Sequence, residues 1–309
     1  MFVFDKAPFP SCHASTLLEA EPGRLLCAWF GGKDEGARDV RIWQAAFDGK
    51  RWSEPVMVAE EPNIPCWNPV LFKSEKGTLF LFYKAGPSPM TWSGFVKTST
   101  DAGKSWGKSE ILQAGLLGPI KNKPITHRGA IVAPTSVESY KAWCSWVERS
   151  TDDGKTWTRH GPIAVPGKPY GLIQPTLFTT SRGNLLALCR ARGIGFVCQS
   201  ESTDGGLTWS EAKATSLLNP NSGIDGVTTK DGAFFIAYNN ARLTRWPLNL
   251  ARSVDDGKTW KNVVAVEENP GEFSYPALIQ GSDGKLHLSY TYNRKHIKYL
   301  SFDPASFPA

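Results

Sequence analysis

The 309-residue sequence has no long hydrophobic run, no dense basic segment and no closely spaced pair of cysteines. A membrane-spanning helix needs about eighteen or more apolar residues in a row, and no run in this chain approaches that length. Residues 1–12 (MFVFDKAPFPSC) lack the basic region, apolar stretch and small-residue cleavage site of a secretion signal. We therefore expect a cytoplasmic protein without a membrane partner, although a chain trimmed of its leader would look the same.

The cysteines and the charges also limit the classes of function. The six cysteines are far apart and form no CxxC motif, which favours neither a disulfide scaffold nor a zinc site. We expect no metal and no cofactor. The 35 lysines and arginines exceed the 29 acids but are scattered, without a basic run of five or more. This pattern does not favour a nucleic-acid partner and leaves a small anionic substrate open.

Four copies of an octapeptide, Ser-x-Asp-x-Gly-x-(Ser/Thr)-Trp, divide the chain at a nearly constant interval. They occupy residues 99–106, 150–157, 202–209 and 253–260, so their tryptophans lie 51, 52 and 51 residues apart. A degenerate copy, FDGKRW, occupies residues 47–52. A fixed period of this length indicates a repeat protein in which each repeat forms one supersecondary unit.

A second repeat, in phase with the octapeptides, consists of two alternating apolar strands joined by a glycine-containing turn. Its six copies begin at residues 15, 69, 124, 175, 226 and 276. Such alternation is typical of β-hairpins, and all-strand repeats of about 40–50 residues are typical of β-propellers with four strands per blade. The sequence predicts an all-β, six-bladed β-propeller that occupies residues 1–309 as a single domain, with the N-terminal FVFD segment completing the last blade.

The octapeptides themselves are predicted to be structural. Their Asp and Ser side chains can accept backbone N–H bonds in a tight turn, their Gly can adopt a positive φ, and their Trp can pack between neighbouring blades. Their aspartates are therefore not expected to be catalytic, conspicuous as they are: Asp101, Asp152, Asp204 and Asp255.

The candidate functional residues lie on the face opposite the octapeptide turns. Antiparallel pairing puts the start of the first strand and the end of the second strand of each blade on that face. First-strand starts supply His13, Trp67, Asn68, Lys121, Lys123, Gln174, Asp225 and Tyr275. Second-strand ends supply Lys84, Arg190, Arg192, Asn240, Asn293 and Arg294. The repeats differ from one another at these positions, as an asymmetric site requires, and the cations among them predict an anionic ligand.

On these motifs the chain resembles the sialidase superfamily, whose Asp-box repeats decorate six-bladed propellers. The resemblance covers essentially the whole chain and is strongest to the predicted-neuraminidase subgroup of BNR-repeat proteins. It rests on the Asp boxes and on the segments CHAST, AWFGGKDEGARDV, CWNPVLF, GPIKNKPI, NPNSGID and FSYPAL. Family sialidases hydrolyse terminal sialic acids with three arginines that hold the carboxylate, a nucleophilic tyrosine, a glutamate that activates it and a loop aspartate as acid and base.

The resemblance implies roles for individual residues. Tyr275 in FSYPAL matches the nucleophile, and Arg192 or Arg190 in LALCRARG matches the second carboxylate-binding arginine. Asp39, in the loop before the degenerate box, matches the acid/base aspartate. The other residues expected to bind substrate are Lys84, Lys121, Lys123, Trp67, Asn68, Asp225, Asn240 and Arg294.

Two positions depart from the family pattern. The opening arginine is replaced by PSCHAS around His13, and the activating glutamate is replaced by Gln174. Because a glutamine amide cannot accept the phenol proton, the usual sialidase chemistry is incomplete. Glu272 is a candidate for the missing carboxylate. Lys121, Lys123 and Lys84 are candidates for the missing cation.

Three functions remain open from the sequence. The first is a sialidase-like glycosidase on a terminal acidic sugar, with Tyr275 as nucleophile and Asp39 as acid, since sialidases are known to use a tyrosine nucleophile. The second is a polysaccharide lyase on uronic acids, with His13 or Tyr275 removing the proton beside a neutralised carboxylate. The third is a carbohydrate-binding propeller without turnover, in which Trp67, Trp92 and Tyr292 stack on sugars.

Overall fold

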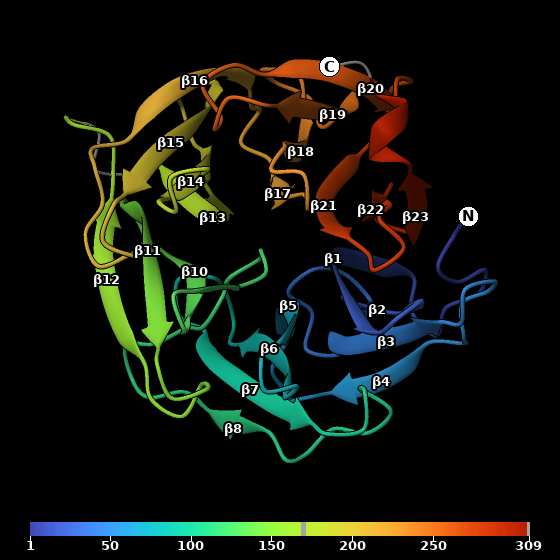
Figure 1. The fold of residues 1–309 in the computed structure, drawn as a ribbon. Coiled ribbons are helices and arrows are strands. Elements are labelled where there is room, and N and C mark those ends of the chain that lie inside the picture. Colours follow the sequence, from blue (N-terminus) through green and yellow to red (C-terminus); the bar gives the residue numbers. More distant parts are fainter. Residues whose placement is uncertain (168–170, 308–309) are drawn as a thin grey trace.

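The computed structural model describes residues 1–167 and 171–307 and shows a six-bladed β-propeller. Six antiparallel sheets surround a common centre, and the chain passes from one blade to the next around the ring (Figure 1). The six-bladed, all-β architecture predicted from the repeats is confirmed. A single turn of 3-10 helix, η1 (Pro304–Ser306), is the only helical element among the described residues. None of those residues forms a helix long and apolar enough to cross a membrane.

Blades one to three contain twelve strands. Blade one comprises β1 (Ser11–Glu21), β2 (Arg24–Gly32), β3 (Arg41–Phe47) and β4 (Val56–Ala59). Blade two comprises β5 (Cys66–Lys73), β6 (Leu79–Ala85), β7 (Ser93–Ser99) and β8 (Glu110–Ile111). Blade three comprises β9 (Ile125–His127), β10 (Ala130–Glu138), β11 (Trp143–Ser150) and β12 (Thr158–Ile163).

Blades four to six contain the remaining strands. Blade four comprises β13 (Leu172–Thr179), β14 (Leu185–Ala191), β15 (Phe196–Ser202) and β16 (Lys213–Leu218). Blade five comprises β17 (Asp225–Thr228), β18 (Phe234–Asn239), β19 (Leu248–Ser253) and β20 (Lys261–Glu267). Blade six comprises β21 (Phe273–Gln280), β22 (Leu286–Tyr292) and β23 (His296–Phe302).

The N-terminus closes the ring, as the sequence predicts. Phe2 forms an antiparallel bridge with Lys298 of β23. The Val3 amide donates to the Ile297 carbonyl at 2.8 Å, and the Tyr299 amide donates to the Met1 carbonyl at 2.9 Å. The N-terminal segment thus supplies the outer edge that blade six lacks, which joins the two ends of the chain.

The octapeptides form the turns between the third and fourth strands. In the second of them, the carboxylate of Asp152 accepts hydrogen bonds from the Ser150 hydroxyl at 2.8 Å and from the Thr156 amide and hydroxyl at 2.9 and 2.6 Å. Gly154 adopts a φ of 83°. Trp157 packs edge-on against Phe82 of the preceding blade. The Asp boxes are therefore turns that also fasten neighbouring blades, and the core lies between adjacent sheets.

Candidate functional site

Four of the first strands begin with a β-bulge, and these bulges set the direction of the site residues. The register slips between His13 and Thr16, Trp67 and Val70, Ile173 and Thr176, and Ser274 and Ala277. Inside each bulge one residue other than glycine adopts a positive φ: Ala14 (59°), Asn68 (37°), Gln174 (54°) and Tyr275 (52°). Bulges are known to re-aim side chains next to active sites, and this strained conformation persists only where packing imposes it.

A cavity of about 180 Å³ lies at these strand starts. It is lined by first-strand starts, by second-strand ends and by the loops that join second to third strands. The lining residues are His13, Glu35, Trp67, Asn68, Pro89, Trp92, Glu138, Gln174, Arg190, Arg245, Tyr275 and Arg294. None of the Asp-box aspartates is among them. The cavity therefore lies where strand geometry predicts it, away from the box turns.

Tyr275 lies at the centre of the polar contacts in this axial cavity. Its hydroxyl oxygen accepts hydrogen bonds from Arg190 Nη1 at 2.8 Å and from Gln174 Nε2 at 3.3 Å. Gln174 Oε1 in turn accepts from Arg190 Nη1 at 3.2 Å, while Arg190 Nε donates to Asn221 Oδ1 at 2.8 Å. Two donors, one of them a cation, thus point at the phenol oxygen.

Arg190 is a buried cation that forms no ion pair with a carboxylate in the part of the chain that the structure describes. Only 7% of its surface is exposed. Its hydrogen bonds go to the side-chain amides of Asn221 and Gln174 and to the phenol of Tyr275, which are all neutral groups. A buried charge normally has an ionic partner, because desolvation is costly. The arrangement of Arg190 therefore favours an anionic ligand in the cavity.

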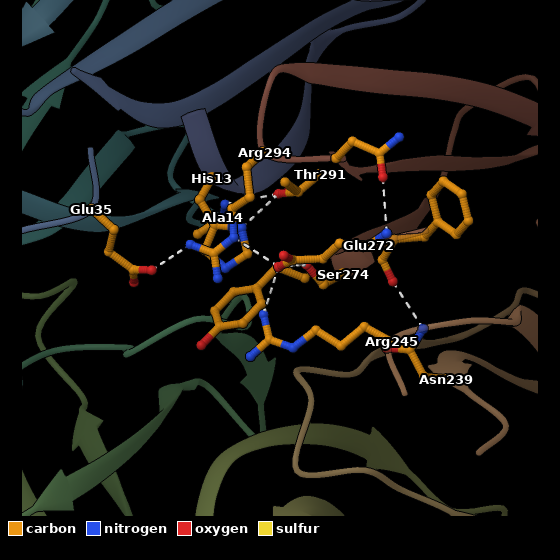
Figure 2. Close-up of polar contacts among 12 residues, drawn as sticks. His13, Ala14, Glu35, Asn239, Arg245, Glu272, Ser274, Thr291 and Arg294 are labelled. Atoms are coloured by element: carbon orange, nitrogen blue, oxygen red, sulfur yellow. Dashed lines mark hydrogen bonds and ion pairs between the residues drawn. The ribbon is translucent and has the colours of Figure 1, made fainter. Parts of the chain in front are cut away.

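The other two arginines share carboxylates (Figure 2). Glu272 accepts from Arg245 Nη1 at 2.9 Å and from Arg294 Nε at 2.7 Å, and Arg294 also forms an ion pair with Glu35. Burial alone would raise the pKa of Glu272, but its bonds to Arg294 and Arg245 hold that pKa below its usual range. Glu272 stays ionised and orients the arginines. It is not among the residues that line the cavity, and the Tyr275 hydroxyl has its hydrogen bonds from Arg190 and Gln174.

His13 is buried next to Tyr275, and their ring centroids are 4.2 Å apart. Its Nδ1 atom shares a hydrogen bond of 3.0 Å with the Thr291 hydroxyl (Figure 2). Burial, and then the positive charges of Arg294, Arg245 and Arg190, hold the pKa of His13 well below its usual range. The imidazole is consequently neutral at physiological pH.

Glu138 is a cavity residue that the sequence did not single out. It lies at the end of β10, half-buried, and its side chain forms no hydrogen bond or ion pair with any other described residue. Burial raises the pKa of its carboxyl above the usual range, and Arg190 opposes that rise. A carboxyl group of this kind is suited to donate a proton.

Several predicted cations lie elsewhere. Lys84 is fully buried and donates to the Pro119 carbonyl, and burial lowers its pKa to about 7. Lys121 donates to the carbonyls of Ile224, at 2.9 Å, and Pro276, and burial likewise lowers its pKa to about 7. Lys84 thus binds the segment ahead of blade three, and Lys121 binds blades five and six; neither lines the axial cavity.

Four further predicted site residues also lie outside the lining of the axial cavity. Lys123 and Asp225 form an ion pair at 3.0 Å, and Asp225 also accepts from the Leu278 amide at 2.8 Å, so both connect blades. Asn240 lies outside the cavity lining. Asp39 is exposed and accepts from the Lys33 amide at 3.0 Å, whereas Glu35 of the same loop reaches the cavity.

Arg192 lies beside the axial cavity rather than in it. Its guanidinium group stacks over the Trp143 ring at 4.6 Å and lines a separate pocket. Arg190, two residues earlier, is the arginine that contacts Tyr275.

The residues that sequence reasoning missed have a common position. Glu35 and Arg245 lie on loops from a second to a third strand, and Glu138 ends a second strand that extends beyond the predicted one. Those loops share the face of the predicted rim, so the same strand geometry could have included them. Continuing the strand pattern past Thr135 would have reached Glu138.

Among residues 1–167 and 171–307, no group of three or more His, Cys, Asp or Glu side chains is placed to hold a metal ion. No disulfide joins any of the six cysteines, all of which lie within the described residues.

Comparison with known proteins identifies the family and the fold. The model of the family described as BNR repeat-like domain matches residues 23–288. A curated sialidase from Micromonospora viridifaciens is 25% identical over 346 residues, covering 96% of this chain and 52% of that protein. The chain therefore spans about half the length of this relative.

Solved structures with the same fold include sialidases. The intramolecular trans-sialidase from Ruminococcus gnavus, solved with oseltamivir carboxylate, has a TM-score of 0.82 at 15% identity and covers 100% of this chain and 98% of its own. The NanB sialidase from Streptococcus pneumoniae has a TM-score of 0.83 at 13% identity, with coverage of 100% and 71%. At these identities the likeness shows the fold.

Proposed function

Since this chain belongs to the family of BNR repeat-like domains, we propose that its axial cavity cleaves the glycosidic bond of a terminal acidic sugar of the sialic acid class. The observation that carries the proposal is the buried Arg190, which lacks a carboxylate partner among the described residues and contacts the hydroxyl of Tyr275. A ligand carboxylate at Arg190 would neutralise this charge and bring the sugar ring to the phenol oxygen.

The cavity offers further groups that suit such a substrate. Arg245 and Arg294 are held in place by Glu272, so their remaining N–H groups are available in a fixed orientation. Trp67 and Trp92 form one wall, with ring centroids 6.0 Å apart, and can pack against the apolar face of a sugar. The cavity thus combines cations for a carboxylate with aromatic surface for a ring.

Tyr275 is the nucleophile in this proposal. Its oxygen attacks the anomeric carbon and releases its proton to water, while the bond to the leaving oxygen breaks and that oxygen takes the proton of Glu138. A water molecule that gives its proton to the Glu138 carboxylate then displaces the tyrosine oxygen from the anomeric carbon, and that oxygen regains a proton from solvent. Gln174 cannot take the phenol proton, but its amide and Arg190 donate to the oxygen and can stabilise negative charge on it.

Glu138 is the proposed proton donor to the leaving oxygen, in place of Asp39. Because its pKa is raised, the protonated form persists to higher pH than in an ordinary glutamate, and activity should decline only above that pKa. We expect Glu138→Gln to lower kcat by about a hundredfold for a sugar leaving group and to remove this decline from the pH profile of kcat/KM. An activated aryl leaving group, which needs little protonation, should be far less affected.

The control for Glu138→Gln is the same substitution at Glu110, an exposed residue of β8, which should leave the pH profile as it is. A Glu138→Gln enzyme that keeps the alkaline decline would show that another group is the acid.

A lyase acting on uronic acids is the second candidate, and His13 favours it. The imidazole is neutral and lies 4.2 Å from the Tyr275 ring, centroid to centroid, so it is able to accept a proton in the same cavity. The cations would then neutralise the carboxylate beside the carbon that loses its proton.

Product analysis distinguishes these activities. The protein is incubated with sialosides and with uronic-acid oligosaccharides. We expect reducing-sugar release from the sialosides and no ultraviolet absorbance from an unsaturated product. Absorbance would identify the lyase, and tight binding without any product would identify a carbohydrate-binding propeller. Either of these results would overturn the glycosidase proposal.

A further inference from the structure

A second and larger cavity, of about 750 Å³, lies between blades three and four. It is bounded by the turn between β10 and β11, by Gly171 ahead of β13 and by the residues that follow β14. The axial cavity is smaller than the range of about 300–1,000 Å³ typical of pockets for drug-sized ligands, so it has room for little more than one sugar ring. The second cavity is within that range.

The two cavities have no lining residue in common, but residues that neighbour one another on β10 and β11 and at the end of β14 line one or the other. Glu138 lines the axial cavity, and its cross-strand partner Trp143 lines the second one. At the end of β14, Arg190 faces the first cavity and Arg192 the second. The positive charges of both arginines oppose the rise that burial causes in the pKa of Glu138. A ligand that leaves the axial cavity past Glu138 would therefore enter the second cavity.

The position of Arg192 is fixed by its surroundings. Its amide donates to the Gly171 carbonyl at 2.7 Å, and the Gly171 amide donates to the Trp143 carbonyl at 3.0 Å. Gly171 has a φ of 141°, and a Cβ there would lie 2.9 Å from the Arg192 carbonyl oxygen, so this approach requires glycine. The guanidinium group is stacked on Trp143. Because it is already ordered, it loses little further conformational entropy when it binds an anion.

The second cavity also has an aromatic side chain that nothing covers within the described structure. Tyr140 is 80% exposed at the tip of the β10–β11 turn, next to Lys141. Arg192 itself forms no ion pair with a described residue. Two cations and an exposed aromatic ring in one cavity suit a sugar that carries a carboxylate.

We propose that this second cavity binds a second acidic sugar, the unit on the leaving-group side of the bond cleaved in the axial cavity. Arg192 and Lys141 hold its carboxylate, and Tyr140 packs on its ring. The preferred substrate is therefore an oligosaccharide with consecutive acidic units. This inference rests on the proposed glycosidase function and deepens it.

The test compares three substrates that share a terminal sialic acid: a sialic acid dimer, sialyllactose and an aryl sialoside. For the unaltered protein we expect kcat/KM to be about tenfold higher for the dimer than for sialyllactose. Arg192→Met should remove most of this preference, mainly through KM, and Tyr140→Ala should reduce it for both oligosaccharides. Arg182→Met, at an exposed arginine on the β13–β14 turn, is the matched control and should preserve it.

The outcomes separate this inference from the function on which it rests. Equal kcat/KM for the dimer and sialyllactose, or a preference that survives in both Arg192→Met and Tyr140→Ala, would overturn the second acidic site while leaving the glycosidase intact. If none of the substrates is cleaved, the proposed function is wrong. Calorimetric titration with the dimer then decides the second site, which requires about tenfold weaker binding by Arg192→Met and unchanged binding by Arg182→Met.

Discussion

The Tyr275→Phe variant is expected to lose about a thousandfold or more in kcat on sialosides, with a much smaller change in KM. The substitution removes only the oxygen that accepts from Arg190 and Gln174. The ring, which lies against His13, is retained, so substrate binding should persist. Single-turnover measurements with an aryl sialoside, whose leaving group needs little assistance, report this step directly.

Tyr238→Phe is the control for the loss of a buried phenol hydroxyl. Tyr238 donates to Asn262 Oδ1 at 2.8 Å within blade five, away from the cavity, so its variant should keep normal kcat. If Tyr275→Phe retains activity within tenfold of the unaltered protein while both variants fold, Tyr275 is not the nucleophile, and the carboxylates of the cavity would have to perform that step.

The fold was predictable because its information is local and repeated. Each Asp box encodes its own turn through side chains at most four residues apart, as the bonds from Ser150 and Thr156 to Asp152 show. The near-constant spacing then gives the number of blades. The same logic predicted the face of the site, since antiparallel strands must return to it.

The individual site residues were less predictable, because their direction depends on features without a strong sequence signal. In a regular strand, successive side chains alternate between the two faces of the sheet. The bulges interrupt this alternation at Gln174 and Tyr275 and direct both side chains into the cavity. Lys84 and Lys121 occupy predicted rim positions, yet their long side chains reach main-chain carbonyls of other blades and of the segments that join blades. Which cations remain available to a ligand is decided by these long-range contacts.

Loops between second and third strands supply further residues of the cavity. Arg245, on the loop from β18 to β19, meets Arg294 of blade six through the shared carboxylate of Glu272. These residues are brought together by closure of the ring and by no local pattern. The resemblance pointed to Asp39 in the β2–β3 loop, but the conformation of that loop presents Glu35 to the cavity instead.

The second large effect is expected at Arg190. Arg190→Met should lower kcat/KM on sialosides by about a thousandfold, because it removes both the cation that awaits the substrate carboxylate and the stronger of the two donors to Tyr275. Arg190→Lys keeps the charge but cannot span Asn221, Gln174 and Tyr275 with one planar group. We expect it to recover only a small part of the loss.

Comparing the two variants separates the effect of the charge from that of the geometry. The reference is either the rate on a neutral aryl glycoside, if the protein cleaves one, or the affinity for the sialoside in a binding assay. The Met variant should also gain thermal stability or leave it unchanged, because a buried cation that forms no ion pair with a described residue costs desolvation energy in the empty protein. Loss of activity together with a preserved or raised melting temperature would identify Arg190 as a residue kept for its ligand. A large fall in the melting temperature would instead show that Arg190 mainly holds blade four together, and the anionic substrate would lose its strongest support.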